Sequence, residues 1–239
     1  MKNLEEKILE ISAKLGNEVH LKAIRNTFIS MLPIMIFGGI FAVIGAAPAT
    51  ENATGFMKAW ADFVSANSAI FSWVSVLGLG FTSLYIALGI TYNLCKEYKV
   101  DPLIPLFICV FGMFMLTVKP EKLVYGTSLT DLTYLDGKGI IVGLFVGIFT
   151  VEIYRILKQK NFGKIKLPDS VPPSLSETFS SLAISVLIML FYLVLFAIFK
   201  SMNTTFAAWI ASIIAPQIKA TDSLWFILLM TFIINAAWF

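Results

Sequence analysis

The sequence predicts an all-α membrane protein: a polytopic bundle of about six transmembrane helices, the last one truncated, with amphipathic helices at the membrane interface. Composition is the first reason, because 58% of the 239 residues are hydrophobic, only 14% are charged and the mean hydropathy is +0.83. The second reason is that long uncharged runs recur, at lengths close to the roughly 20 residues that a helix needs to cross a bilayer. The third is that polar or basic connectors separate these runs.

The first crossing follows a charged approach. Residues 1–26 place apolar side chains at helical spacing among charged ones, which predicts an amphipathic helix on the cytoplasmic side of the membrane, with a soluble helix packed on the loops as the alternative. Residues 28–47 carry no charge and form the first crossing. We therefore divide the chain into this interfacial segment and a transmembrane domain, residues 27–239.

The second crossing lies within residues 63–95, a run without a formal charge that is longer than one helix needs. Residues 72–92 form its core, and residues 64–71 form a cap or a re-entry into the membrane. Three glycines allow close helix approach or local unwinding of this core: Gly78, Gly80 and Gly89.

The third crossing, residues 103–118, is short and contains Pro105. We expect it to run steeply through the membrane or to be partly shielded by protein. Asp101 and Pro102 precede it, and these residue types favour a helix start.

The fourth crossing, residues 139–157, carries a glycine ridge with a spacing of four residues: Gly139, Gly143 and Gly147. A weaker ridge lies in the first crossing: Gly38, Ala42 and Ala46. Small residues at this spacing let two helix backbones approach closely. We favour packing within one subunit, with packing between two subunits as the alternative.

The remaining part of the chain predicts two further crossings. Pro172 and Pro173 lead into a helix start, after which residues 178–199 form the fifth crossing. Residues 201–218 are interpreted as an amphipathic helix parallel to the membrane rather than a crossing. Residues 223–239 form the sixth, which stops without a charged flank.

The distribution of basic residues predicts the orientation of the chain. With the N-terminus in the cytoplasm, 12 of the 18 basic residues fall in cytoplasmic segments and six fall outside. This imbalance agrees with the positive-inside rule. Because the basic residues cluster in loops between crossings, they indicate membrane topology and not nucleic-acid binding.

The residues alone assign no catalytic, cofactor-binding or metal site. Cys95 and Cys109 lack metal-ligand spacing, and Cys109 is interpreted as a small buried hydrophobic residue. His20 is interpreted as structural, with a titrating or phosphoryl-accepting role as the alternative. Glu152 and Arg155 are interpreted as a local ion pair at the interface, with a functional role as the alternative.

Asn235 is the most interesting polar residue in a predicted crossing, because an amide in hydrocarbon needs a hydrogen-bonding partner. A hydrogen bond between helices is our interpretation of this residue. It implies no ligand.

Three stretches carry a resemblance to a known family: HLKAIR at residues 20–25 with Phe28 and Pro33 after it, LPDSVPPSLSETFSSL at residues 167–182, and NAAWF at residues 235–239. In this order they resemble the N-terminal half of the enzyme IIC component, the sugar permease, of bacterial phosphoenolpyruvate-dependent phosphotransferase systems. The lactose, cellobiose and diacetylchitobiose branch is the most similar. The chain departs from the pattern at Asn26–Thr27, where Asp–Gly is usual, and at Gly39, where Ser is common.

This resemblance implies a bacterial plasma-membrane protein that couples uptake of a β-linked disaccharide to its phosphorylation. It also implies a homodimer, a soluble IIB phosphocarrier as partner and no resident cofactor. The sugar-site histidine and glutamate of the family would lie beyond residue 239, so none of them transfers to this sequence. The chain is therefore expected to be the scaffold and dimerisation half, inactive alone. The alternatives are a small stand-alone membrane scaffold or regulatory protein, and an unrelated multi-pass transporter.

Overall fold

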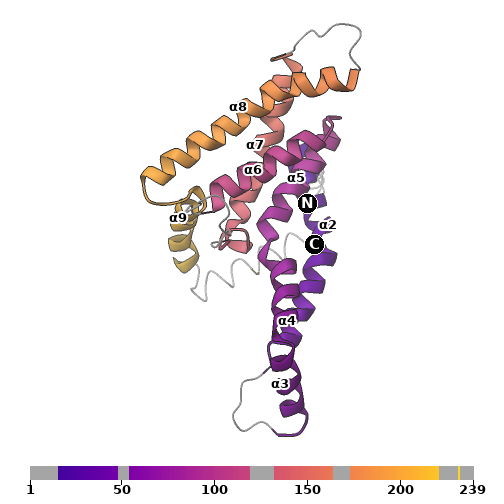
Figure 1. Ribbon diagram of the computed structural model, residues 1–239, viewed down its shortest axis with the longest axis vertical. Helices are drawn as coiled ribbons and strands as arrows, with labels where there is room; N and C mark the ends of the chain where they lie inside the picture. Colours follow the sequence, from indigo (N-terminus) through magenta and orange to yellow (C-terminus); the bar gives the residue numbers. More distant parts are fainter. Residues whose placement is uncertain (1–15, 48–53, 119–131, 164–172, 221–230, 232–239) are drawn as a thin grey trace, which may run out of the picture.

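The computed structural model describes residues 16–47, 54–118, 132–163, 173–220 and 231, and within these ranges it contains helices and no strand. The predicted all-α class is therefore confirmed for the described part of the chain. The predicted crossing at residues 223–239, the amide of Asn235 and most of the amphipathic approach lie outside the described residues. Figure 1 shows an elongated molecule, with a narrow arm at one end and a broader group of helices at the other.

Helix α2 (Val19–Gly45) passes without a break from the charged approach into the first apolar run. Within the described residues it is one of three helices that are long and apolar enough to cross a membrane, together with the segments Gly137–Gln159 and Ser181–Ser201. A bent pair, Phe56–Ala66 and Ser68–Gly80, would make a fourth span if its two parts are counted as one. The predicted count of six crossings stays a prediction.

The second apolar run folds as a broken helix. Helices α3 (Phe56–Ala66) and α4 (Ser68–Ser75) are followed by a π-helical turn, η1 (Val76–Gly80), and by helix α5 (Thr82–Glu97). The irregular turn contains Gly78 and Gly80, which agrees with local unwinding, one of the two roles expected for these glycines. Gly78 also meets Gly38 of α2 so closely that a Cβ added at Gly38 would lie 2.6 Å from the Gly78 Cα.

Helix α6 (Leu103–Thr117) is short, and it is partly shielded by protein, one of the two arrangements expected: seven of its residues are buried, while Phe107 is 67% exposed. Its buried residues pack with those of helices α7 (Ile140–Gln159) and α8 (Pro173–Ser201) in the larger hydrophobic core. Cys109 is fully buried in that core, which confirms its interpretation as a small hydrophobic residue. The Asp101 side chain accepts a hydrogen bond from the Leu103 backbone N–H at 2.9 Å and so caps the helix start.

Helices α5 and α7 pack closely against each other, and the predicted glycine ridge is the reason. A Cβ added at Gly143 would lie 2.4 Å from the carbonyl oxygen of Ser83, and one added at Gly147 would lie 2.9 Å from that of Ala87. The ridge therefore packs within one chain, as favoured from the sequence. The chain before α7 contributes as well, because the Ser83 backbone N–H donates to the Leu135 carbonyl at 2.9 Å.

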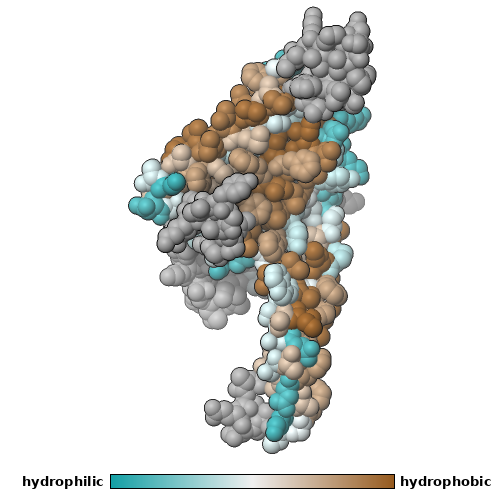
Figure 2. All heavy atoms as spheres, in the orientation of Figure 1, coloured by the Kyte–Doolittle hydropathy of each residue, from teal (hydrophilic) through white to brown (hydrophobic). Residues whose placement is uncertain are grey.

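Helix α9 (Phe206–Ala220) completes the described fold and packs against α6, α7 and α8. Phe206 and Trp209 contact the ring of Phe199, which anchors α9 to the end of α8. Figure 2 shows hydrophobic side chains spread along α8 and the neighbouring flank of the bundle, while hydrophilic residues gather toward the ends. This distribution is the one expected for helices in contact with lipid tails.

Candidate functional site: a charged cluster where three helix ends meet

Three helix ends come together at the end of the bundle that holds the start of α2. Because α2 and α5 are antiparallel, the N-terminus of α2 lies beside the C-terminus of α5, and the C-terminal turns of α7 lie next to both. Five polar residues meet there, and we call them the His20 cluster: Glu18, His20, Tyr98, Glu152 and Arg155.

Glu152 is the centre of the cluster, because it accepts hydrogen bonds from three different elements. One carboxylate oxygen lies 3.0 Å from Nε2 of His20 and 2.5 Å from the Tyr98 hydroxyl. The other accepts from the Arg155 guanidinium at 2.7 Å. The predicted local ion pair is therefore confirmed. It is also part of a wider network that joins α2, the end of α5 and α7.

His20 lies between two carboxylates. Its Nδ1 is 2.7 Å from a carboxylate oxygen of Glu18, and its Nε2 faces Glu152. A neutral imidazole carries one N–H and can donate to only one of these oxygens, whereas the protonated ring donates to both. The geometry therefore favours the imidazolium, which with Arg155 balances the two carboxylates.

Glu18 also caps helix α2. Its second carboxylate oxygen accepts from the backbone N–H of Leu21 at 2.8 Å. Hydrogen bonds from the His20 side chain and from this backbone group lower the pKa of Glu18 from 4.5 to about 2. Glu18 is therefore ionised at neutral pH, and it holds His20 from the side opposite Glu152.

Tyr98 and Arg155 close the cluster on the side of α5. The Arg155 guanidinium lies over the Tyr98 ring, 4.1 Å from its centroid. Burial, and then the hydrogen bond to Glu152, raise the pKa of Tyr98 to about 12, so its hydroxyl is a donor at neutral pH. A separate ion pair, Lys22 to Glu97 at 2.8 Å, ties α2 to α5 beside the cluster.

The cluster can hold a proton and fix helix ends in place. Within the described ranges the structure contains no group of three or more side chains that could hold a metal ion. Sequence reasoning singled out the Glu152–Arg155 pair and His20 but did not connect His20 to the pair. It missed Glu18 and Tyr98. An acidic residue just before an apolar-periodic helix is a helix-start signal that points to Glu18, but no local pattern marks Tyr98.

The fold and this cluster define a multi-pass helical membrane protein with long apolar helices and a charged network at one end. Residues 25–239 match the family model described as phosphotransferase system, EIIC, and the chain belongs to this family. Tyr98, Glu152 and Arg155 lie inside the matched range, and Glu18 and His20 precede it. The resemblance to the EIIC family drawn from the sequence is confirmed.

Several relatives give the comparison its detail. The oligo-β-mannoside-specific EIIC component of Bacillus subtilis is 27% identical over 238 residues, which cover 97% of this chain and 52% of that protein. The cellobiose-specific EIIC component of Geobacillus stearothermophilus is 28% identical, over 75% of this chain and 41% of its own length. The lactose-specific EIICB component of Lacticaseibacillus casei is 26% identical, over 93% of this chain and 38% of its own length.

A solved structure shares the fold. The crystal structure of ChbC, the IIC component from the N,N'-diacetylchitobiose-specific phosphotransferase system, aligns with a TM-score of 0.71 and 21% identity. The alignment covers 93% of this chain and 53% of ChbC. The chain thus spans about half, or less, of the length of the proteins that it matches.

Proposed function

We propose that this chain is the scaffold half of a phosphotransferase-system sugar permease, one that couples uptake of a β-linked disaccharide to its phosphorylation. The family match over residues 25–239 carries the proposal, together with the partial coverage of every relative named above. Those relatives are specific for oligo-β-mannosides, cellobiose and lactose, which supports the same class of sugar here. The half alone is inactive, and the complete permease is a homodimer in the bacterial plasma membrane.

The N-terminus is cytoplasmic in this proposal, which places the His20 cluster at the cytoplasmic end of the bundle. The cluster joins α2, α5 and α7 there, so it holds the end of the scaffold that faces the soluble partner. The same end carries exposed basic side chains on α2 and α5 and directly after α5 and α7: Arg25, Lys96, Lys99 and Lys160. These cations suit a phosphorylated IIB protein, because a phosphoryl group is strongly anionic.

The transport test uses a bacterial strain that lacks its own permeases for these sugars but keeps the soluble phosphotransfer proteins. One plasmid encodes residues 1–239. A second joins them in frame to the C-terminal part of the B. subtilis oligo-β-mannoside EIIC component that this chain does not cover. We expect phosphoenolpyruvate-dependent uptake of labelled cellobiose, lactose or a mannobiose with the chimera and none with residues 1–239.

Membrane fractionation is the control, since both proteins must reach the membrane before their activities are compared. Uptake by residues 1–239 alone would contradict the scaffold proposal. Entry of unphosphorylated sugar into cells without the phosphotransfer proteins would favour the unrelated transporter. A correctly inserted chimera that transports none of the three sugars would also count against the proposal.

The partner test reverses charge at the proposed cytoplasmic face. In the chimera, the double variant Lys96→Glu, Lys99→Glu is expected to weaken IIB binding by about 2–30-fold at low salt, because exposed charge pairs contribute about 0.2–1 kcal/mol each. Lys58→Glu is the matched control, since Lys58 is equally exposed but lies on α3, at the far end of the molecule. Surface-plasmon measurements on nanodiscs compare the variants. If Lys58→Glu weakened IIB binding as much as the double variant does, docking at the His20 end would be refuted.

A further inference from the structure

The arm in Figure 1 is built by the C-terminal half of α2 together with α3, α4 and η1. Close approaches fix the antiparallel alignment: Gly45 meets Phe71, Gly38 meets Gly78, and Gly89 meets Thr27. From Thr27 to Gly45 the helix rises about 27 Å, close to the thickness of a hydrocarbon core. The segment that packs antiparallel along α2 therefore consists of α4, η1 and α5. Helix α3 lies beyond the C-terminal end of α2.

Helix α3 is bent by 74° from the segment that follows it, and it is amphipathic. Phe56 and Phe63 are 80% and 57% exposed, and they share a helical face with Trp60. Lys58 and Asp62 lie on the opposite face. A short helix that turns away from a membrane span, with one apolar and one charged face, has the features of an interfacial helix.

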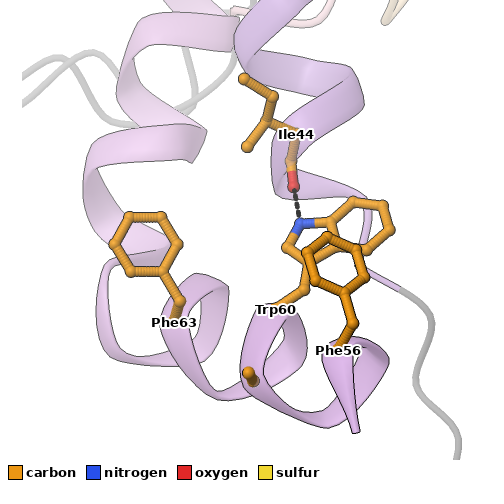
Figure 3. Close-up of a pocket in the computed structure, with 5 residues that line it drawn as sticks. Ile44, Phe56, Trp60 and Phe63 are labelled. Atoms are coloured by element: carbon orange, nitrogen blue, oxygen red, sulfur yellow. Dashed lines mark hydrogen bonds between the residues drawn. The ribbon is translucent and has the colours of Figure 1, made fainter.

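An apolar groove of about 590 Å³ lies between α3 and the end of α2, and five residues line it: Ile44, Phe56, Ala59, Trp60 and Phe63. Figure 3 shows Phe63 on one side of the groove and Trp60 with Phe56 on the other. The indole N–H of Trp60 donates to the Ile44 carbonyl at 2.9 Å. The only polar atom of the Trp60 side chain therefore has a hydrogen-bond partner, and the ring presents hydrocarbon to the groove.

The groove continues an apolar surface that already runs along the membrane-spanning helix. On α2, Phe37 and Ile40 are 56% and 51% exposed, and Ile44, seven and four residues further on and therefore on the same helix face, lines the groove. Side chains that face lipid tails along α2 thus lead directly into the groove between α2 and α3. This continuity favours a hydrocarbon chain as the occupant.

We propose that the groove binds an acyl chain of a phospholipid in the leaflet opposite the His20 cluster, with α3 lying in the headgroup region. Trp60 fixes α3 to the end of α2 through its hydrogen bond, and its ring forms one wall of the site. Lys58 and Asp62 on the outer face of α3 remain in contact with water and headgroups. The proposal concerns anchoring of the arm and does not depend on the transport activity proposed above.

Trp60 reports on this site through its own fluorescence. A variant that keeps Trp60 and carries Phe at the other four tryptophans is reconstituted, as the full chain, in phosphatidylcholine vesicles. We expect strong quenching by lipids brominated near the headgroup end of the acyl chain, less by lipids brominated at its methyl end, and little by iodide in the water. The difference in fluorescence quenching between the wild-type chain and the Trp60→Phe variant measures the same Trp60 signal without the other four substitutions.

Two alanine positions on α3 separate binding in the groove from simple nearness to lipid. Ala59→Phe fills the groove and is expected to reduce bromine quenching of Trp60 about twofold, because a filled cleft no longer encloses a ligand chain. Ala66→Phe, an exposed position outside the groove, is expected to leave it unchanged. Circular dichroism confirms that each variant is folded.

Three results would overturn the proposal. Strong iodide quenching without bromine quenching would place α3 in water. Protection from both quenchers would show that protein covers the groove. Equal effects of the two phenylalanine variants would show that no chain is bound in it.

Discussion

Replacing Glu152 with alanine is expected to lower the free energy of unfolding by about 2–3 kcal/mol, because three donors lose a charged acceptor at once. His20, Tyr98 and Arg155 all direct N–H or O–H groups to this carboxylate, and only 21% of the Glu152 side chain is exposed. The Nε atom of Arg155 is already buried without a hydrogen-bond partner among the described residues. Arg155 therefore has no second acceptor in place when the Glu152 carboxylate is removed.

Titration of the purified chain from mild detergent into sodium dodecyl sulfate, followed by circular dichroism, measures this change. Glu152→Gln keeps an acceptor oxygen but loses the charge, and an intermediate value is expected. Glu97→Ala is the matched control, since it removes only the partner of Lys22 in a half-exposed ion pair, at a cost of about 0.2–1 kcal/mol. If Glu152→Ala cost no more than Glu97→Ala, the His20 cluster would not be what holds these helix ends.

Gly143→Ala is expected to destabilise the chain by about 1–3 kcal/mol, although alanine is the better helix former. The new methyl group would lie 2.4 Å from the Ser83 carbonyl oxygen, and this atom belongs to the backbone of α5. A backbone cannot rotate away as the end of a long side chain can, so α5 and α7 must separate along their whole contact. Gly143→Leu is expected to cost more.

Gly39→Ala is the control for this prediction. Gly39 is also in the interior of a membrane-spanning helix, but a Cβ added there meets nothing within 4 Å. The same substitution is therefore expected to be neutral or to stabilise the chain by up to about 1 kcal/mol, the helix-propensity difference. The same detergent titration compares the two variants. Equal shifts would show that propensity, and not the α5–α7 contact, decides the effect.

Local patterns in the sequence identified most of the helices. Apolar runs placed α2, α6, α7 and α8 because a bilayer requires helices of a certain length. Glycine spacing identified the ridge on α7 for a related reason, since only small side chains allow backbones to approach closely. The aromatic stripe of α3 was not recognised, although Phe56, Trp60 and Phe63 recur at helical spacing and would have revealed this helix.

The sequence by itself determined the class of this protein: an all-helical membrane protein of the EIIC family, with a charged approach before its first span. These properties depend on composition, run length and short motifs, all of which are local. Tertiary structure alone decided which residues meet. Glu152 is 132 positions from His20 and 54 from Tyr98, and no local pattern specifies such a pairing. The packing of α2 on α5 and of α5 on α7 brings the three helix ends together, because glycines hold those helices in one alignment. The same alignment leaves α3 beyond the end of α2, where its apolar face opens a groove.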